Sequence, residues 1–153
     1  MIIPIQQHEI DNFFIRYETR FNDALQGGEP EIEETARSFT ESFIESSPLG
    51  VISGNNDENF RKSIGEGWAF YKSIGIHSME ILSTQITIID THHALVKVHW
   101  RSTFTRKKDN SAGEIAFDVF YLLQKKDDVL RIFAYITGDE QQALKDVGLV
   151  PEH

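Results

Sequence analysis

The sequence predicts an α+β fold in which three N-terminal helices pack in the concave face of a curved antiparallel sheet. Two patterns carry this prediction. In the first half of the chain, apolar residues recur every three or four positions, which is typical of helices with one buried face. From His77 onward, apolar and polar residues alternate, which is typical of strands. The length of 153 residues fits one domain, so residues 1–153 are predicted to form a single unit.

Three segments show the helical spacing, 8–26, 30–45 and 57–74, and a short strand is expected at 49–53. Glycine or proline follows each helical segment and would end the helix there. The buried faces are predicted to be Ile10, Phe14, Tyr17, Phe21 and Leu25 in the first, Ile32, Ala36, Phe39 and Phe43 in the second, and Phe60, Ile64, Trp68 and Tyr71 in the third.

Four strands are expected at 77–89, 93–106, 114–125 and 129–137, and a last helix at 139–147. The links between the strands are short and polar. Strands joined in this way are usually antiparallel neighbours in one sheet. These four strands are therefore predicted to lie next to each other in the sheet in the order in which they follow in the sequence.

The alternation divides the strand residues between two faces. The apolar face should lie under the helices, and it is predicted to contain Leu82, Thr84, Ile86, Ile88, Ala94, Val96, Val98, Trp100, Ser102, Phe104, Ile115, Phe117, Val119, Tyr121, Leu123, Leu130, Ile132, Ala134 and Ile136. Glu80 would lie near the mouth of this concave face. A tight hairpin at 107–112 would pair Trp100 with Val119 and Arg101 with Asp118.

The other face mixes charged residues with four large apolar ones, Phe120, Leu122, Phe133 and Tyr135. Such a group on an open sheet would leave a sizeable apolar patch exposed to water. A second copy of the chain covering the patch is the simplest explanation. We therefore expect a homodimer that forms through the outer face of the sheet.

Composition excludes several kinds of protein. The chain has no cysteine, which rules out disulfides, thiol catalysis and thiolate metal sites and suits a reducing cytoplasm. Acidic residues number 24 against 15 basic ones, and the basic run Arg106-Lys107-Lys108 is followed by Asp109, so nucleic-acid binding is not expected. The N-terminus shows no signal-peptide pattern, and no apolar stretch is long enough for a membrane span.

The sequence gives only weak support for catalytic residues. Asp118 could act as a base held by Arg101, with His99 beside it, but only if the two sheet faces are exchanged; otherwise they form surface ion pairs. Glu80 in an apolar pocket would have a raised pKa and could transfer protons, whereas at a solvated strand end it would not. His92 and His93 are adjacent and would point to opposite faces, so no metal site is expected, and no organic cofactor is evident.

Six aromatic residues are the candidates for the wall of a ligand pocket: Tyr17, Trp68, Tyr71, Trp100, Phe117 and Tyr121. Most of them combine an apolar body with a polar group, as residues that line pockets often do. The alternative is that they are ordinary core residues, because they recur at the spacing that buries a helix or strand face. Both interpretations stay open at this point.

The order of the elements resembles that of the nuclear transport factor 2-like superfamily, whose members form a cone-shaped, cystatin-like α+β barrel. Local similarities are Phe14, Tyr17 and Phe21 in the first helix, the run Val96-Lys-Val-His-Trp100, and the ending that starts at Leu130. The resemblance covers about residues 8–150. It implies a ligand pocket inside the cone and dimers that form through the outer sheet face, as in ketosteroid isomerases, SnoaL-type polyketide cyclases and limonene epoxide hydrolase.

The resemblance carries over no catalytic residue. The isomerases place an acidic base and a tyrosine–acid pair inside the cone, and the epoxide hydrolases place an Asp-Arg-Asp relay there. The inward strand positions of this chain supply only Trp100, Ser102, Tyr121 and Glu80.

Three functions follow as hypotheses: a domain that binds a small apolar ligand, an acid–base enzyme acting on a hydrophobic substrate, or a protein-interaction domain. Binding is preferred because no converging titratable groups are expected inside the cone. Two or more Asp, Glu, His or Arg side chains in the cavity would favour an enzyme, and a fully packed cone would favour an interaction domain.

Overall fold

The computed structural model describes residues 2–151 as one six-stranded sheet with four helices. The elements are α1 (Gln7–Leu25), α2 (Ile32–Arg37), β1 (Phe39–Ser47), β2 (Gly50–Asn55), α3 (Glu58–Ser73), β3 (Ile76–Ile88), β4 (His93–Thr105), β5 (Ala112–Lys126), β6 (Val129–Ile136) and α4 (Glu140–Asp146). The strand order is β2-β1-β6-β5-β4-β3. All neighbouring strands are antiparallel except β1 and β6, which run parallel.

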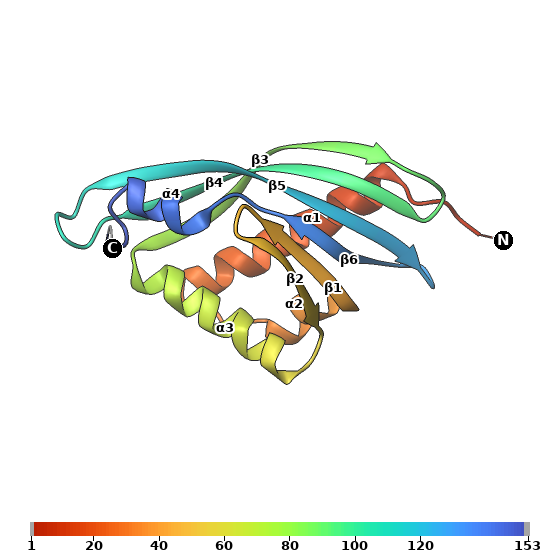
Figure 1. Cartoon of the computed structure of the whole chain (residues 1–153), viewed down its shortest axis with the longest axis horizontal. Coiled ribbons are helices and arrows are strands. Elements are labelled where there is room, and N and C mark those ends of the chain that lie inside the picture. Colours follow the sequence, from red (N-terminus) through yellow and green to blue (C-terminus); the bar gives the residue numbers. More distant parts are fainter. Residues whose placement is uncertain (1, 152–153) are drawn as a thin grey trace.

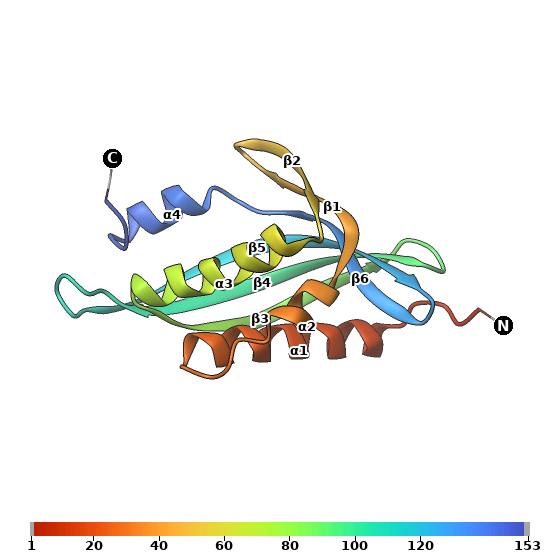
Figure 2. The ribbon, with the colours of Figure 1, turned by 90° about the horizontal axis from the view of Figure 1, so that it is seen from below.

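The sheet is curved, and the helices lie on its concave side (Figure 1). Seen from below, α1 follows the β3 side of the sheet, α3 crosses beneath the middle strands, and the β1–β2 hairpin rises at the opposite side (Figure 2). The predicted α+β fold with helices in the concave face of the sheet is confirmed. None of the helices within residues 2–151 is long and apolar enough to cross a membrane.

Strand β4 forms the centre of the core. Its burial alternates without interruption, so Ala94, Val96, Val98, Trp100, Ser102 and Phe104 all face the helices, as predicted. Trp100 is 1% exposed and packs in one cluster with Phe14 of α1 and Leu123 of β5. Aromatic rings of this size dominate the burial of apolar surface in a core.

The predicted second helix is only half right, because the segment 30–45 forms a short helix and then a strand. Phe39 and Phe43 are both buried, and a spacing of four places two residues on one face in either conformation. At Ser38 the chain leaves the helix: the carbonyl of Ser38 accepts a hydrogen bond from the N–H of Ile132 in β6. The residues that follow pair with β6 on one side and β2 on the other.

The predicted register of the β4–β5 hairpin is wrong by two residues. Trp100 lies opposite Phe117, and Asp118 lies opposite His99 instead of Arg101. The connection has the expected length but starts one residue earlier, because Thr105 pairs with Ala112 and residues 106–111, not 107–112, join the two strands. A shift of two residues leaves every side chain on the same face, so the alternation of apolar residues does not reveal it.

Two bulges exchange faces where unbroken alternation was expected. In β3 the pairing passes from Ile81 to Ser83, so Leu82 is the extra residue and Glu80 points to the outer face. The expectation that Glu80 lies at the mouth of the concave face is therefore wrong. The inward residues before this bulge are Met79 and Ile81, which pair with Ser102 and Trp100.

The second bulge lies in β6 at Phe133, between the pairs Leu123–Ile132 and Leu122–Ala134. Beyond it, Ala134 and Ile136 face outward and Tyr135 faces inward, the reverse of the prediction. Tyr135 is therefore no part of the outer face. Phe133 packs edge-on against the outer-face residue His93, with ring centroids 5.9 Å apart.

One charged residue is buried at the end of the inward face. Lys125 is 6% exposed and follows Leu123 on the apolar side of β5. Its ammonium group binds Glu9 of α1, with 2.9 Å between Nζ and Oε1. The pair ties the first turn of α1 to the sheet.

Candidate ligand-binding cavity

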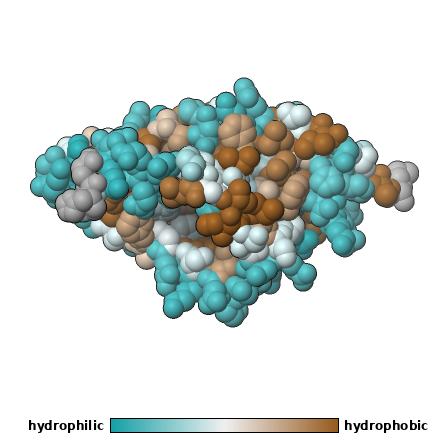
Figure 3. Space-filling model, viewed as in Figure 1, coloured by the Kyte–Doolittle hydropathy of each residue, from teal (hydrophilic) through white to brown (hydrophobic). Residues whose placement is uncertain are grey.

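A cavity of about 490 Å³ lies between the sheet and the helices. Its lining comes from α1, α2, α3, α4 and five of the six strands, β2 being the exception. On the face seen in Figure 3, the surface is hollowed between α3, α4 and the β1–β2 hairpin. Hydrophobic side chains gather over the hairpin. The volume falls within the range of roughly 300–1,000 Å³ usual for small-molecule sites.

All six aromatic residues predicted for a pocket wall line this cavity. Their rings pack in series, because Tyr17 lies 6.4 Å from Trp100 and 6.2 Å from Tyr121 between ring centroids. At the α3 side, Phe21 stacks on Tyr71 at 5.9 Å and meets Trp68 edge-on at 6.2 Å. Aromatic rings therefore form a large part of the wall.

In the part of the chain that the structure describes, the interior of the cavity carries hydroxyl groups and no ionised group. The indole N–H of Trp100 donates to the Tyr121 hydroxyl at 3.2 Å. Burial raises the pKa of Tyr17 to about 12 and raises the pKa of Tyr121 well above its ordinary value. Both phenols are therefore neutral near pH 7 and serve as hydrogen-bonding groups, not as bases. The Ser102 hydroxyl is buried in the same wall and has no hydrogen-bond partner among the described residues.

Carboxylates are found at the rim. Three carboxylates line the cavity: Glu45 of β1, Asp139 just before α4, and Glu140 of α4. Glu45 is half-buried, and the other two are exposed. The Tyr71 hydroxyl donates to the Glu140 carboxylate. Burial, and then the charge of Glu45, raise the pKa of Tyr135, so this phenol is neutral as well. No Lys, Arg or His within residues 2–151 belongs to the lining.

Four rim and wall residues were missed for identifiable reasons. Glu45 lies in the segment interpreted as a helix, and Tyr135 follows a bulge that alternation does not show. Asp139 and Glu140 begin the last helix, and nothing in its short sequence indicates that it folds back over the cavity. One signal could have revealed Glu45: residues 39–47 contain Phe, Thr and Ile, which favour strands over helices.

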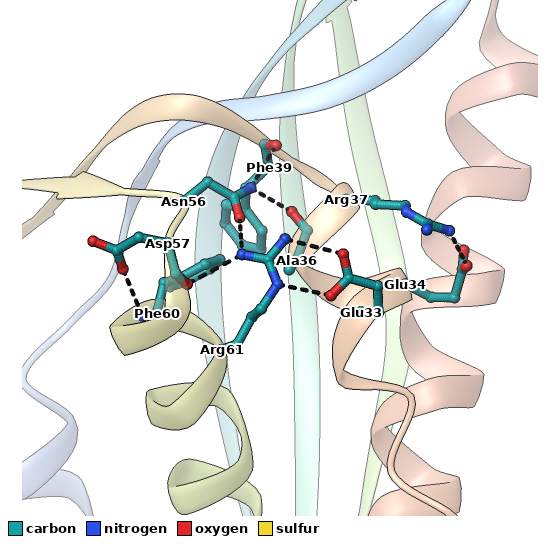
Figure 4. A network of polar contacts seen from close by, with 9 residues as sticks. All are labelled: Glu33, Glu34, Ala36, Arg37, Phe39, Asn56, Asp57, Phe60 and Arg61. Carbon is teal, nitrogen blue, oxygen red and sulfur yellow. Dashed lines mark hydrogen bonds and ion pairs between the residues drawn. The ribbon is translucent and has the colours of Figure 1, made fainter.

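A polar network outside the cavity fixes the elements that carry its wall (Figure 4). Arg61 of α3 donates two hydrogen bonds to the carboxylate of Glu33 in α2, from Nε to Oε2 at 2.7 Å and from Nη2 to Oε1 at 3.0 Å. Arg61 also donates to Asn56, whose amide group donates to the carbonyls of Ala36 and Phe39. The network joins α2, β1 and α3, and so it sets the positions of Phe39 and Phe60 in the cavity wall.

The four candidate catalytic residues lie on the outer face of the sheet, away from the cavity. Glu80 binds Arg101, with 2.6 Å between Oε2 and Nη2. Asp118 accepts from His99 at 2.7 Å and lies 3.8 Å from the ammonium group of Lys97. These are surface ion pairs, as the alternative interpretation had it, but the expected Arg101–Asp118 partnership is wrong because of the register. Within residues 2–151 no three His, Asp or Glu side chains form a group that could hold a metal ion.

Residues 8–140 match the model of the NTF2-like protein family DUF6841. The chain belongs to this family. No curated protein matches the sequence. The predicted membership of the nuclear transport factor 2-like superfamily is thus confirmed for most of the chain.

Solved structures of several other proteins share the fold at low sequence identity. An NTF2-like protein with a cystatin-like fold from Novosphingobium aromaticivorans has a TM-score of 0.66 and 9% identity, with 94% of this chain and 88% of that chain covered. A putative scytalone dehydratase from the same organism gives 0.60 and 15%, covering 83% and 78%. A ketosteroid isomerase-like protein from Erwinia carotovora atroseptica gives 0.56 and 19%, covering 84% and 92%.

Proposed function

We propose that this NTF2-like domain binds a small, largely apolar molecule in the cavity between sheet and helices. The observation that carries the proposal is the aromatic cavity of about 490 Å³ with neutral hydrogen-bonding groups in its wall. A pocket of this kind gains affinity from apolar burial and orientation from a few polar groups. The open cavity argues against the hypothesis of a fully packed interaction domain. A cytoplasmic location stays a prediction.

Tryptophan fluorescence tests ligand binding, because both tryptophans of the chain, Trp68 and Trp100, line the cavity. We expect steroids or short polyketides from an apolar panel to change the emission in a saturable manner. Gly67→Phe should abolish the response, since Gly67 lines the cavity and the space beyond its Cα is open. Ala69→Phe adds the same ring to the exposed side of α3 and should have no effect. A panel without any saturable response would contradict the proposal.

A second candidate, an acid–base enzyme, is supported by the rim. Three carboxylates line the cavity, which meets the number set above for favouring catalysis, but only Glu45 is partly withdrawn from water. Binding without chemistry is preferred because the interior holds neutral phenols and no His or Arg of the described residues is part of the lining. Recovery of the bound molecules after incubation separates the two: unchanged ligands support binding, and a converted ligand supports catalysis.

We also propose that two copies of the chain associate through the outer sheet face. Leu95, Leu122, Ala134 and Ile44 are successive cross-strand partners on β4, β5, β6 and β1, which makes one continuous apolar row. Phe120 and Ile136 form the next row, and Ile136 is 45% exposed. Beside these rows lie both cations and anions, so the face can meet a copy of itself without like charges opposing each other.

Light scattering tests the dimer. Phe120→Glu places a charge in the middle of the apolar rows, and we expect this variant to have the mass of a single chain. Ile15→Glu makes the same kind of change at an exposed site on α1, 57% exposed, and should leave the dimer intact. A wild-type protein with the mass of one chain, or a dimeric Phe120→Glu variant, would contradict this interface.

A further inference from the structure

We propose that the ligand of the cavity is an organic cation, with an apolar ring-containing body inside and a protonated amine held at the rim by Glu45 and Glu140. The inference rests on the proposed binding function and goes further by assigning the charge of the ligand. It follows from the charge balance of the rim, from the aromatic surfaces next to the carboxylates, and from one unpartnered hydroxyl deep in the wall.

The charge balance of the rim is one-sided. Three carboxylates line the cavity and no cationic side chain within residues 2–151 does. Neither Glu45 nor Glu140 takes part in any ion pair within that range. Arg20 lies next to the wall, where it donates to Thr35 at 3.0 Å and to Ser38 at 2.8 Å, but it does not line the cavity. A cationic ligand would supply the missing opposite charge.

Asp139 is not included among the proposed partners of the amine because it already has a role. Its carboxylate accepts from the N–H of Gln142 at 3.0 Å and so caps α4. Glu140 is different, because its side-chain partner among the described residues is the Tyr71 hydroxyl, which donates to the carboxylate and orients it at the rim. An oriented carboxylate is better suited to bind an ammonium group than a freely rotating one.

Aromatic rings adjoin both carboxylates. Tyr71 reaches Glu140 and also stacks on Phe21 at 5.9 Å, and Tyr135 is the cross-strand partner of Glu45 and stacks on Tyr121 at 6.5 Å. The face of an aromatic ring attracts a cation and does not attract an anion. Carboxylates combined with aromatic faces therefore select an alkylammonium group over a neutral or acidic group of the same size.

The unpartnered hydroxyl of Ser102 is a separate sign that the cavity receives a ligand. Ser102 is 2% exposed, lines the cavity and has no hydrogen-bond partner among the described residues. A buried polar group without a partner is costly, so such groups usually meet a ligand or a water molecule. A ligand with a polar atom at its buried end would pair with this hydroxyl while its amine stays at the rim.

Calorimetry with three ligands that share one ring system tests the charge assignment. The probes are naphthylethylamine, naphthylethanol and naphthylacetate, which differ in charge at the end of the same apolar body. We expect the amine to bind about tenfold more tightly than the alcohol, and the acetate more weakly than both. Added salt should weaken the binding of the amine and leave that of the alcohol nearly unchanged.

Variants locate the effect. In Glu45→Gln and in Glu140→Gln, the ratio of amine to alcohol affinity should fall several-fold. Glu41→Gln removes the same charge from an exposed position of β1 outside the lining, and the ratio should stay as in the wild type. Equal binding of all three probes would overturn the charge assignment and leave the binding function standing. If none of the three binds, both the assignment and the binding function are contradicted.

Discussion

Replacement of Gly75 by alanine is expected to destabilise the protein by about 3 kcal/mol or more. Gly75 joins α3 to β3 with φ of +101°, a conformation that residues with a Cβ rarely adopt. An added Cβ would also press into the backbone carbonyl of Thr105 at the end of β4. That backbone cannot give way easily, because the N–H of Thr105 donates to the Gly75 carbonyl at 3.0 Å. Urea denaturation measures the loss.

Gly67→Ala is the matched control within the same chain. Gly67 lies inside α3, and a Cβ added there meets nothing within 4 Å. Alanine is the better helix former by about 1 kcal/mol, so this variant should be slightly more stable than the wild type. Equal effects of the two substitutions would show that the junction of α3 and β3 is not constrained as described.

Glu9→Ala is expected to cost about 3 kcal/mol, because it leaves the ammonium group of Lys125 buried without its partner. The Lys125 side chain is 7% exposed and that of Glu9 is 23% exposed, so the two ends of the pair are unequal. Lys125→Met removes the buried charge and keeps a side chain of similar length. It should therefore cost clearly less than Glu9→Ala, since the remaining carboxylate is the more hydrated partner.

A surface pair provides the comparison for this experiment. Lys62 and Glu66 are 3.9 Å apart on α3, with side chains 75% and 66% exposed. Pairs of this kind contribute little, so Glu66→Ala should change stability by less than about 0.5 kcal/mol. Urea denaturation of the three variants would contradict the argument if Lys125→Met proved as damaging as Glu9→Ala.

The fold could be predicted wherever one period persists along an element. In β4, thirteen residues alternate without a break, and both faces of this strand were assigned correctly. The prediction for the segment from Phe39 to Phe43 was wrong because two apolar residues four positions apart lie on one face of a helix and also on one face of a strand. The register of β4 against β5 was predicted wrongly because a shift of two residues preserves the faces, and only the exact position of the connection along the chain decides it.

The cavity could be predicted in part. Its aromatic wall follows from large residues on the concave faces of regular elements, and all six of those predicted line it. The rim could not be predicted, because it depends on where α4 and the β1–β2 hairpin fold back. Neither position is encoded in a local pattern. The outer-face ion pairs of Arg101 and Asp118 likewise depend on a bulge in β3 and on the true register.

Because of the bulge at Phe133, the faces to which the residues of β6 point depend on the number of residues in the strand as much as on their types. One extra residue turns Tyr135 towards the cavity and Ile136 towards the outer face of the sheet. Removal of that residue would exchange these two positions without any substitution, so the cavity would lose a phenol while the outer face gained one. Relatives that differ by a single insertion or deletion in this strand would therefore have different pockets and different contact surfaces, even where the remaining residues of β6 are identical.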